Sequence, residues 1–169
     1  MGSGKSTIGK KLAARLKIYF IDLDDEIEKD HQISIKEMFK SMGETYFRKI
    51  ESKKIGEVIK NQNPAVISLG GGALINEENL KLVLETGRLI YIQSSPEEIW
   101  KRTKHSKRRP LLSPDEDKKS KSQYLNRIQE LLKVRNKGYT AAHIKVNRDG
   151  LEAEEVTELI YQNLMKNDF

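Results

Sequence analysis

Short apolar runs alternate with longer amphipathic stretches along this chain. The apolar runs are rich in Ile, Val and Tyr and mostly lack polar alternation, which is typical of strands buried on both faces. The predicted strands are Tyr19–Asp22, Ala65–Leu69, Leu89–Gln93 and Ile144–Val146. Helical spacing predicts helices over Lys5–Leu16, Ile35–Phe39, Thr45–Lys60, Glu77–Glu85, Pro96–Lys104, Lys121–Ala142 and Glu152–Lys166. This alternation of strand and helix predicts an α/β fold built on a parallel sheet.

Composition limits the classes of protein that fit. The 169 residues are enough for one well-buried core, so we expect a single domain over residues 1–169. Hydrophobic residues make up 37% and charged residues 33%, and no apolar run approaches the ~18 residues of a membrane span. The stretch Met1–Leu12 has no apolar signal-peptide core, and the chain has no cysteine. We therefore expect a cytoplasmic protein with no membrane partner.

The net charge of +6 comes from one segment. Residues 101–121 hold nine basic and three acidic residues, gathered around Arg108-Arg109-Pro110. A nucleic-acid binder usually spreads its basic residues along a face or helix, whereas a short basic patch in a loop suits a small polyphosphate better. We therefore predict no nucleic-acid partner. The alternative is a solvated loop without a role.

The chain opens with the closing half of a phosphate-binding loop, G-x-x-x-x-G-K-[ST], whose first glycine would lie before Met1. The loop runs straight into a predicted helix, whose N-terminus favours phosphate. Lys5 is expected to reach the outer phosphates, Ser6 to ligate Mg²⁺, and Thr7 to cap the helix or touch an inner phosphate. The alternative is a disordered Gly/Ser-rich start or a false match.

Two aspartates follow the first predicted strand. Asp22 and Asp24 lie at its C-terminal end, where open parallel sheets place ligand groups. One can serve the metal and the other an acceptor hydroxyl. The alternative is capping of a helix through Ile27 by Asp24 or Asp25.

Three later motifs indicate an anionic acceptor. Arg48 lies among aromatics in G-E-T-Y-F-R, where it can bind a carboxylate or simply form a surface ion pair. The glycines Gly70, Gly71 and Gly72 directly follow a strand, which favours close approach of the backbone to a ligand. R-R-P-L-L, with Arg109, precedes Arg135 in V-R-N-K-G-Y. Two arginines far apart in sequence can converge on one anion.

Taken in order, these motifs resemble those of the shikimate kinases. The likeness covers G-S-G-K-S-T, D-L-D, G-E-x-x-F-R-x-x-E (Gly43 to Glu51), G-G-G, R-P-L-L and R-x-x-x-Y, and so nearly the whole chain. It implies a P-loop kinase of the nucleoside-monophosphate-kinase type. Such an enzyme uses ATP to phosphorylate the 3-hydroxyl of shikimate, on the path to chorismate and the aromatic amino acids. The implied cofactors are ATP and Mg²⁺, and the implied state is a monomer.

The resemblance also implies roles for individual residues. The ATP phosphates would be bound by Gly2, Ser3, Gly4, Lys5, Ser6 and Thr7. Ser6 and Asp22 would hold Mg²⁺, and Arg102 and the Val146–Gly150 loop, with Arg148, would flank adenine. Arg109 would belong to a mobile lid, about residues 105–120, and would reach the transferring phosphoryl group.

On the acceptor side, the resemblance implies that Asp24 binds the shikimate hydroxyls and helps to accept the proton. Arg48 and Arg135 would hold the carboxylate. Within Gly70–Gly72, the amide of Gly71 would touch substrate. Lys5, Asp24 and Arg109 are thus the expected catalytic residues.

The family also carries a buried strand ahead of the loop, at the centre of a three-layer fold with strand order 2-3-1-4-5. This sequence holds no such strand 1. We therefore expect a gap between the strands Ala65–Leu69 and Leu89–Gln93, and a natural chain that starts about ten residues earlier, a length that allows for one strand. Two other functions stay open: a gluconate-kinase-like enzyme, and a non-catalytic ATP-binding module.

Overall fold

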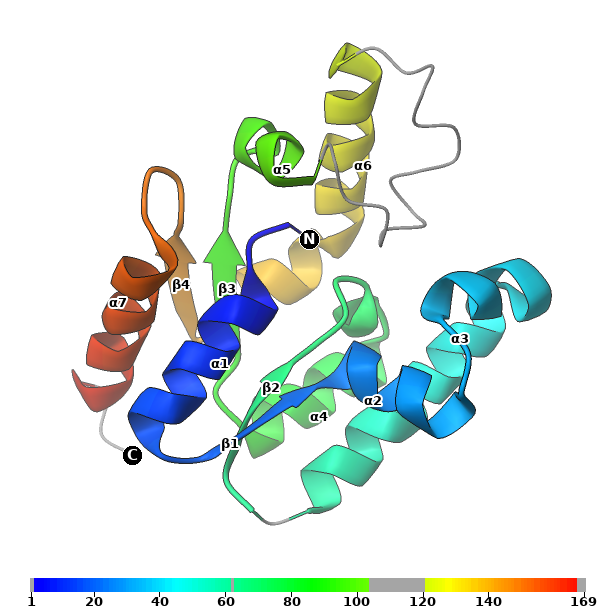
Figure 1. The fold of residues 1–169 in the computed structure, drawn as a ribbon, viewed down its shortest axis with the longest axis horizontal. Helices are drawn as coiled ribbons and strands as arrows, with labels where there is room; N and C mark the ends of the chain where they lie inside the picture. The colour runs from blue at the N-terminus through cyan, green and yellow to red at the C-terminus, as the bar shows by residue number, and fades with distance from the viewer. Residues whose placement is uncertain (1, 62, 104–120, 167–169) are drawn as a thin grey trace.

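Short strands and longer helices alternate in a computed structural model that describes residues 2–61, 63–103 and 121–166 (Figure 1). In chain order the elements are α1 (Lys5–Leu16), β1 (Tyr19–Asp22), α2 (Leu23–His31), α3 (Ile35–Lys60), β2 (Ala65–Ser68), the short 3₁₀ helix η1 (Ala73–Ile75), α4 (Glu77–Thr86), β3 (Ile90–Gln93), α5 (Pro96–Thr103), α6 (Lys121–Thr140), β4 (Ile144–Asn147) and α7 (Ala153–Lys166). The four predicted strands are confirmed.

The strands form two parallel pairs. β1 pairs with β2, and β3 pairs with β4, over all four residues of each strand. These pairs match positions 2-3 and 4-5 of the expected order. Within the described ranges no backbone pairing joins β2 to β3, so the sheet is divided in two at the gap that the sequence predicts. The division falls where the expected order places strand 1.

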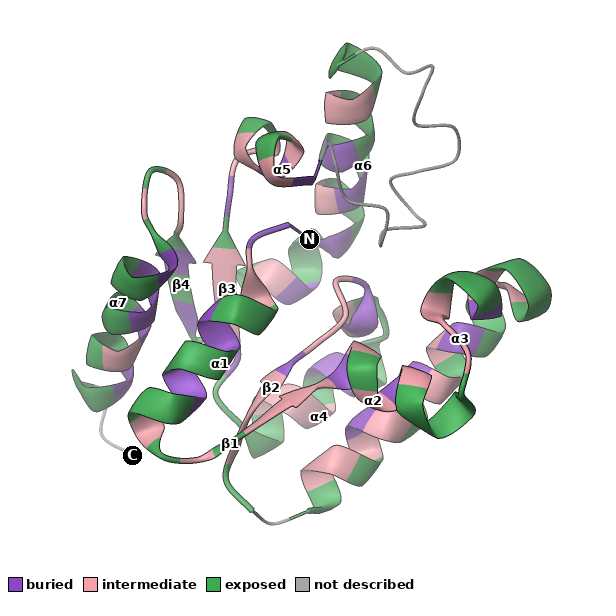
Figure 2. Cartoon of the chain, in the orientation of Figure 1, coloured by how far each residue is buried: buried purple, intermediate pink, exposed green. Residues whose placement is uncertain are grey.

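Helices cover both faces of the strands and give three layers. On one face, Ile8 of α1 and Val156 of α7 pack in a cluster that includes Ile90 and Ile92 of β3. On the other face, Tyr91 packs with a cluster drawn from α4 and from the residues that directly precede β3 and β4. Successive side chains of β3 thus point to opposite layers, as the pleat of a strand requires. Figure 2 shows the buried positions along the helix surfaces that face the strands.

Glycine explains why one helix was predicted as two. Ser34 caps the start of α3, and its hydroxyl and the Glu37 carboxylate form a reciprocal capping box. Gly43 then has φ 82° and ψ 166°, which breaks the helical path. Glycine adopts this positive φ without the steric cost of a Cβ. The two predicted segments are therefore one element with a kink at Gly43.

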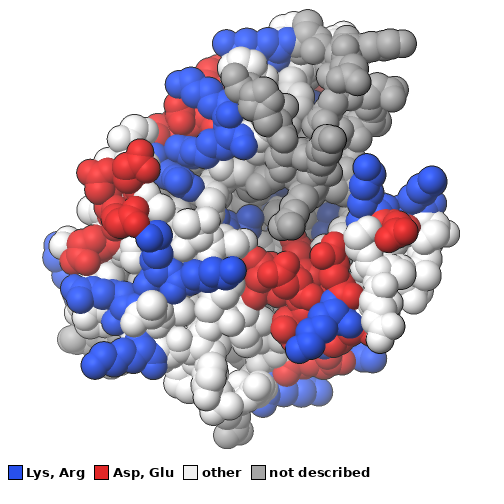
Figure 3. Space-filling view, viewed as in Figure 1, with Lys and Arg blue, Asp and Glu red and all other residues white. Residues whose placement is uncertain are grey.

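The sequence analysis did not include α2 among its helices. Asp22 caps this helix by accepting a hydrogen bond from the amide of Asp24 at 3.2 Å. The hypothesis that Asp24 or Asp25 caps it was wrong, because both already lie in its first turn. Carboxylates there interact favourably with the helix N-terminus. Figure 3 shows acidic side chains gathered over this part of the surface.

The other boundaries agree with the prediction to within two residues, the usual uncertainty at frayed helix ends. Within residues 2–61, 63–103 and 121–166, no helix combines the length and apolar content needed to cross a bilayer. Most of the basic segment, including Arg109 and the predicted lid, lies outside the described residues.

Two helical glycines give a matched test of this packing. A Cβ at Gly138 in α6 would lie 2.8 Å from Cβ of Leu74, whereas one at Gly56 in α3 would meet nothing within 4 Å. We predict that Gly138→Ala destabilises the protein by about 1–3 kcal/mol through overpacking. Gly56→Ala should stabilise it by roughly 0.5–1 kcal/mol, because the unfolded chain loses freedom. Urea unfolding measures both, and equal shifts of the two midpoints would contradict the packing.

Candidate active site

The loop before α1 presents a helix N-terminus. Gly4 has φ 81°, a left-handed conformation, and no side chain caps the helix that follows. The first turn of α1 also has no acidic residue. The amides of this turn have no partner within the helix, and the helix dipole favours negative charge there. The local geometry of Gly2 to Thr7 is therefore suited to phosphate, and phosphate binding there stays a prediction.

Ser6 and Asp22 meet at this site. The Ser6 hydroxyl donates a hydrogen bond to Oδ2 of Asp22 at 2.5 Å. The other carboxylate oxygen of Asp22 caps α2, so the two oxygens serve different elements. A hydroxyl and a carboxylate oxygen are the hard ligands that Mg²⁺ prefers, and Mg²⁺ commonly completes its shell with phosphate and water. Neither oxygen belongs to a larger cluster of three or more acidic, His or Cys groups among the described residues.

Two further carboxylates, the half-buried Asp24 and the buried Glu51, lie near Ser6 and Asp22. Burial raises the pKa of Asp24 above its ordinary 3.8, and the nearby Asp22 raises it further, while Lys5 opposes the shift. Glu51 of α3 is 1% exposed, and its burial likewise raises its pKa although Arg48 opposes this. A carboxylate with a raised pKa is a better proton acceptor at neutral pH than an ordinary one.

Arg48 is fixed by two carboxylates. Nη1 donates to Glu51 at 2.6 Å, and Nη2 donates to Glu44 at 2.9 Å. Nε also donates to Glu44, at 3.2 Å, and the guanidinium lies 5.2 Å from the ring centroid of Phe47. A guanidinium has five N–H groups, so each terminal nitrogen keeps one N–H beyond these bonds. The alternative of a surface ion pair is thus present, with Glu44 as the partner, and a buried bond to Glu51 accompanies it.

The three consecutive glycines each touch a different charged group. A Cβ at Gly70 would collide with Oε1 of Glu51, and one at Gly72 would collide with the guanidinium of Arg48. A Cβ at Gly71 would lie 2.8 Å from Nη1 of Arg135. Any side chain here would therefore push a charged group out of place. The structure brings Arg48, Arg135 and Asp24 together around this turn, although they lie far apart in sequence.

Helix α6 supplies the second arginine and an aromatic support. Arg135 is 6% exposed, and Tyr139 one turn later donates from its hydroxyl to the carbonyl of Gly71 at 3.5 Å. The ring of Tyr139 stacks on Tyr91 of β3, with centroids 4.2 Å apart and planes at 9°. Burial raises the pKa of Tyr91 to about 12, so both phenols stay neutral donors at neutral pH. This stack connects the glycine turn to the sheet.

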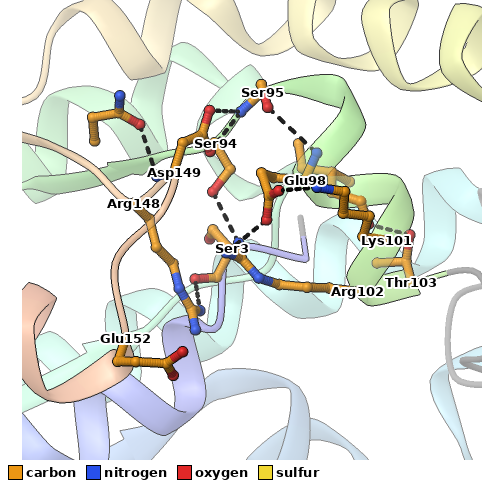
Figure 4. A network of polar contacts seen from close by, with 12 residues as sticks. Ser3, Ser94, Ser95, Glu98, Lys101, Arg102, Thr103, Arg148, Asp149 and Glu152 are labelled. Atoms are coloured by element: carbon orange, nitrogen blue, oxygen red, sulfur yellow. Dashed lines mark hydrogen bonds and ion pairs between the residues drawn. The ribbon is translucent and has the colours of Figure 1, made fainter.

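A second group of polar contacts surrounds the phosphate-type loop (Figure 4). Arg148 reaches from the end of β4 and donates through Nη1 to the carbonyl of Ser3, against Gly4. Burial, together with the charge of Arg102, lowers the pKa of Arg148. Arg102 itself donates to Ser94 at 3.3 Å and to Glu98 at 3.2 Å. Both arginines predicted for the adenine side thus lie beside the loop.

Comparison with known proteins decides the family. A family model described as shikimate kinase matches residues 1–165. The chain belongs to the shikimate kinase family. It is 39% identical to a shikimate kinase of Thermus thermophilus over 99% of this chain and 87% of that protein. It is 42% identical to one of Chlorobaculum tepidum over 98% and 88% of the two chains.

Solved structures that resemble this chain are also shikimate kinases. A shikimate kinase from Acinetobacter baumannii in complex with shikimate matches with a TM-score of 0.88 and 29% identity, over 100% of this chain and 90% of that one. The enzyme from Aquifex aeolicus matches with a TM-score of 0.81 and 37% identity, over 99% and 93%. The predicted family, the α/β P-loop fold and the class of ATP-dependent kinase are confirmed.

One residue of this shikimate kinase site was missed by the sequence analysis. Glu51 appeared there only as the last letter of a motif. Its Oε1 accepts no hydrogen bond from the described part of the chain, although it is buried beside Asp24 and Gly70. The spacing of three between Arg48 and Glu51 places both on one helix face, and that signal was present in the sequence.

The raised pKa of Asp24 gives a stability prediction. A buried carboxylate whose folded-state pKa exceeds its unfolded value destabilises the fold at neutral pH, and protonation at low pH removes that cost. Asp24→Asn should therefore raise the unfolding temperature at pH 7, and the gain should shrink as the pH falls towards 3.8. The exposed neighbour Asp25 provides the control, since Asp25→Asn should change stability by less than about 0.5 kcal/mol. A less stable Asp24→Asn at pH 7 would contradict the assignment.

Proposed function

We propose that this chain transfers the γ-phosphoryl group of ATP to the 3-hydroxyl of shikimate, a step towards the aromatic amino acids. The observation that carries the proposal is the turn Gly70–Gly72, against which Arg48, Arg135 and Glu51 lie. Asp24 also lies against this turn and is close enough to Lys5 of α1 for its charge to affect the pKa of Asp24. A hydroxylated, carboxylated acceptor fits two arginines and two carboxylates. The relative from Acinetobacter baumannii, whose solved complex contains shikimate, supports the same substrate.

In this proposal the loop Gly2 to Thr7 binds the phosphates of the nucleotide. Arg102 and Arg148, which lie beside the loop, contact the adenine. The amides of Gly2 to Thr7 and the ammonium of Lys5 bind the phosphates. Arg102 and Arg148, which lie within electrostatic reach of each other, flank the base. Ser6 and Asp22 would hold Mg²⁺, which would supply positive charge at the phosphates. Arg109 is proposed to add positive charge to the transferring group from outside the described residues.

The acceptor is held by its carboxylate and activated at its hydroxyl. Arg48 and Arg135 bind the carboxylate, each through charge-assisted hydrogen bonds. The raised pKa of Asp24 suits it to accept the hydroxyl proton as the oxygen attacks. Glu51 keeps Arg48 in place and offers Oε1 to a substrate hydroxyl. Positioning and charge supply most of the catalysis in phosphoryl transfer.

We further propose that the protein acts as a monomer in the cytoplasm. Every residue proposed for the site comes from one chain, which supports a monomer. The substrates are small molecules, and the predicted absence of nucleic-acid and membrane partners stays a prediction.

Arg135→Ala tests the carboxylate site. We predict a KM for shikimate about 10- to 150-fold higher, the value of a lost bond to a charged group, with the KM for ATP within about threefold. The control is Arg127→Ala on the same helix, where Arg127 pairs with Glu130 at the surface; both KM values should stay unchanged. Release of ADP with gluconate but not with shikimate, or equal effects of Arg135→Ala on both KM values, would contradict the proposal.

A further inference from the structure

Tyr139 is fixed in place beside Arg135. It follows Arg135 by one turn of α6, so the two side chains share one face of the helix. The half-buried ring of Tyr139 stacks on Tyr91 of β3, with ring centroids 4.2 Å apart. Because the ring is held against a strand of the sheet, its hydroxyl keeps one position next to the turn Gly70–Gly72.

The hydroxyl of Tyr139 bridges Arg135 and this glycine turn. The Arg135 side chain is hydrogen-bonded to it, and a guanidinium can only donate, so the phenol oxygen accepts. The hydroxyl donates its own proton to the carbonyl of Gly71, at the long distance of 3.5 Å. Burial raises the pKa of Tyr139 although Arg135 opposes this, so the phenol stays neutral at neutral pH. A neutral phenol donates and accepts together, which neither a phenolate nor a phenylalanine can do.

Arg135 is thereby held on two sides. A Cβ at Gly71 would lie 2.8 Å from Nη1 and 3.4 Å from Cζ of Arg135, so the guanidinium lies directly against the glycine backbone. Helix α6 comes this close because Gly138 has no side chain, since a Cβ there would lie 2.8 Å from Cβ of Leu74. An arginine that is already held needs little ordering when an anion binds, whereas a free arginine loses rotamer freedom at that step.

We propose that Tyr139 is a positioning residue for the acceptor: its hydroxyl holds Arg135 against the glycine turn, so that the guanidinium is in place for the substrate carboxylate before the substrate binds. Tyr139 can act in this way only if Arg135 binds that carboxylate, so the role rests on the proposed function. Tyr139 acts through Arg135 and does not need to touch shikimate. Loss of its hydroxyl weakens the binding of shikimate and leaves the rate of phosphoryl transfer in the bound complex unchanged.

The test measures two quantities in Tyr139→Phe: the shikimate affinity by isothermal titration, and kcat by release of ADP at saturating shikimate. This variant keeps the ring that stacks on Tyr91 and loses only the hydroxyl. The control is Tyr124→Phe on the same helix, which loses a hydroxyl bond of 3.1 Å to Thr103 of α5 instead. Thermal unfolding of each variant shows that it is folded at the temperature of the titration.

Tyr139→Phe should bind shikimate about 3- to 10-fold more weakly, the range expected when one arginine must be ordered on binding, with kcat within about twofold. Tyr124→Phe should bind shikimate as tightly as the unaltered chain. A double-mutant cycle decides whether Tyr139 acts through Arg135. In Arg135→Ala, the added Tyr139→Phe change should weaken shikimate binding no further.

Three results would overturn this role of Tyr139: unchanged shikimate affinity in Tyr139→Phe, a fall in kcat alone, or an equal loss of affinity with and without Arg135. If Arg135→Ala still binds shikimate weakly in those cases, the proposed function stands and only the role of Tyr139 fails. An unaltered chain that binds no shikimate would overturn the proposed function, and the role of Tyr139 with it.

Discussion

Glu51 is a carboxylate with 1% of its surface exposed, and Arg48 is held against it at 2.6 Å. A buried charge is tolerated only when it is paired, so this bond constrains everything around it. Its second oxygen lies against Gly70 and near Asp24, where no side chain has room. The position of the glycine turn, the orientation of Arg48 and the environment of Asp24 therefore depend on one ion pair inside α3.

The proposed metal-side and acceptor-side groups lie where β1 runs directly into α2. Asp22 bonds Ser6 of the phosphate-type loop with one oxygen and caps α2 with the other. Asp24, in the turn that this cap stabilises, faces the glycine turn. Asp22 and Asp24, which we propose for the metal side and the acceptor side, are thus two residues apart. A displacement of Asp22 therefore also moves Asp24, because both lie at the start of α2. This suits a reaction whose rate depends on the alignment of its two substrates.

Local patterns predicted most of the fold. Apolar runs located all four strands, and the break between two predicted helical segments coincides with the kink at Gly43. The sequence did not decide between a ligand site and a helix N-terminus at the Asp-rich start of α2, because carboxylates are typical of both. The sequence identified Arg48, Arg135 and the glycines as separate motifs, but their contacts come from tertiary packing. Glu51 was missed for this reason, since burial of a glutamate depends on neighbours distant in sequence. Arg109 lies outside the described residues, so its role stays a prediction.

The absence of side chains at Gly70–Gly72 lets charged groups approach the proposed substrate site. Isothermal titration of shikimate into Gly71→Ala tests this directly, because the added Cβ would lie 2.8 Å from Nη1 of Arg135 and displace only a side-chain end. The control is Gly87→Ala, whose Cβ would make only an ordinary contact of 3.8 Å with the Val83 carbonyl. The account predicts shikimate binding at least tenfold weaker in Gly71→Ala, about 1.4 kcal/mol, with unchanged binding in Gly87→Ala. Equal shikimate affinity in both variants would contradict it.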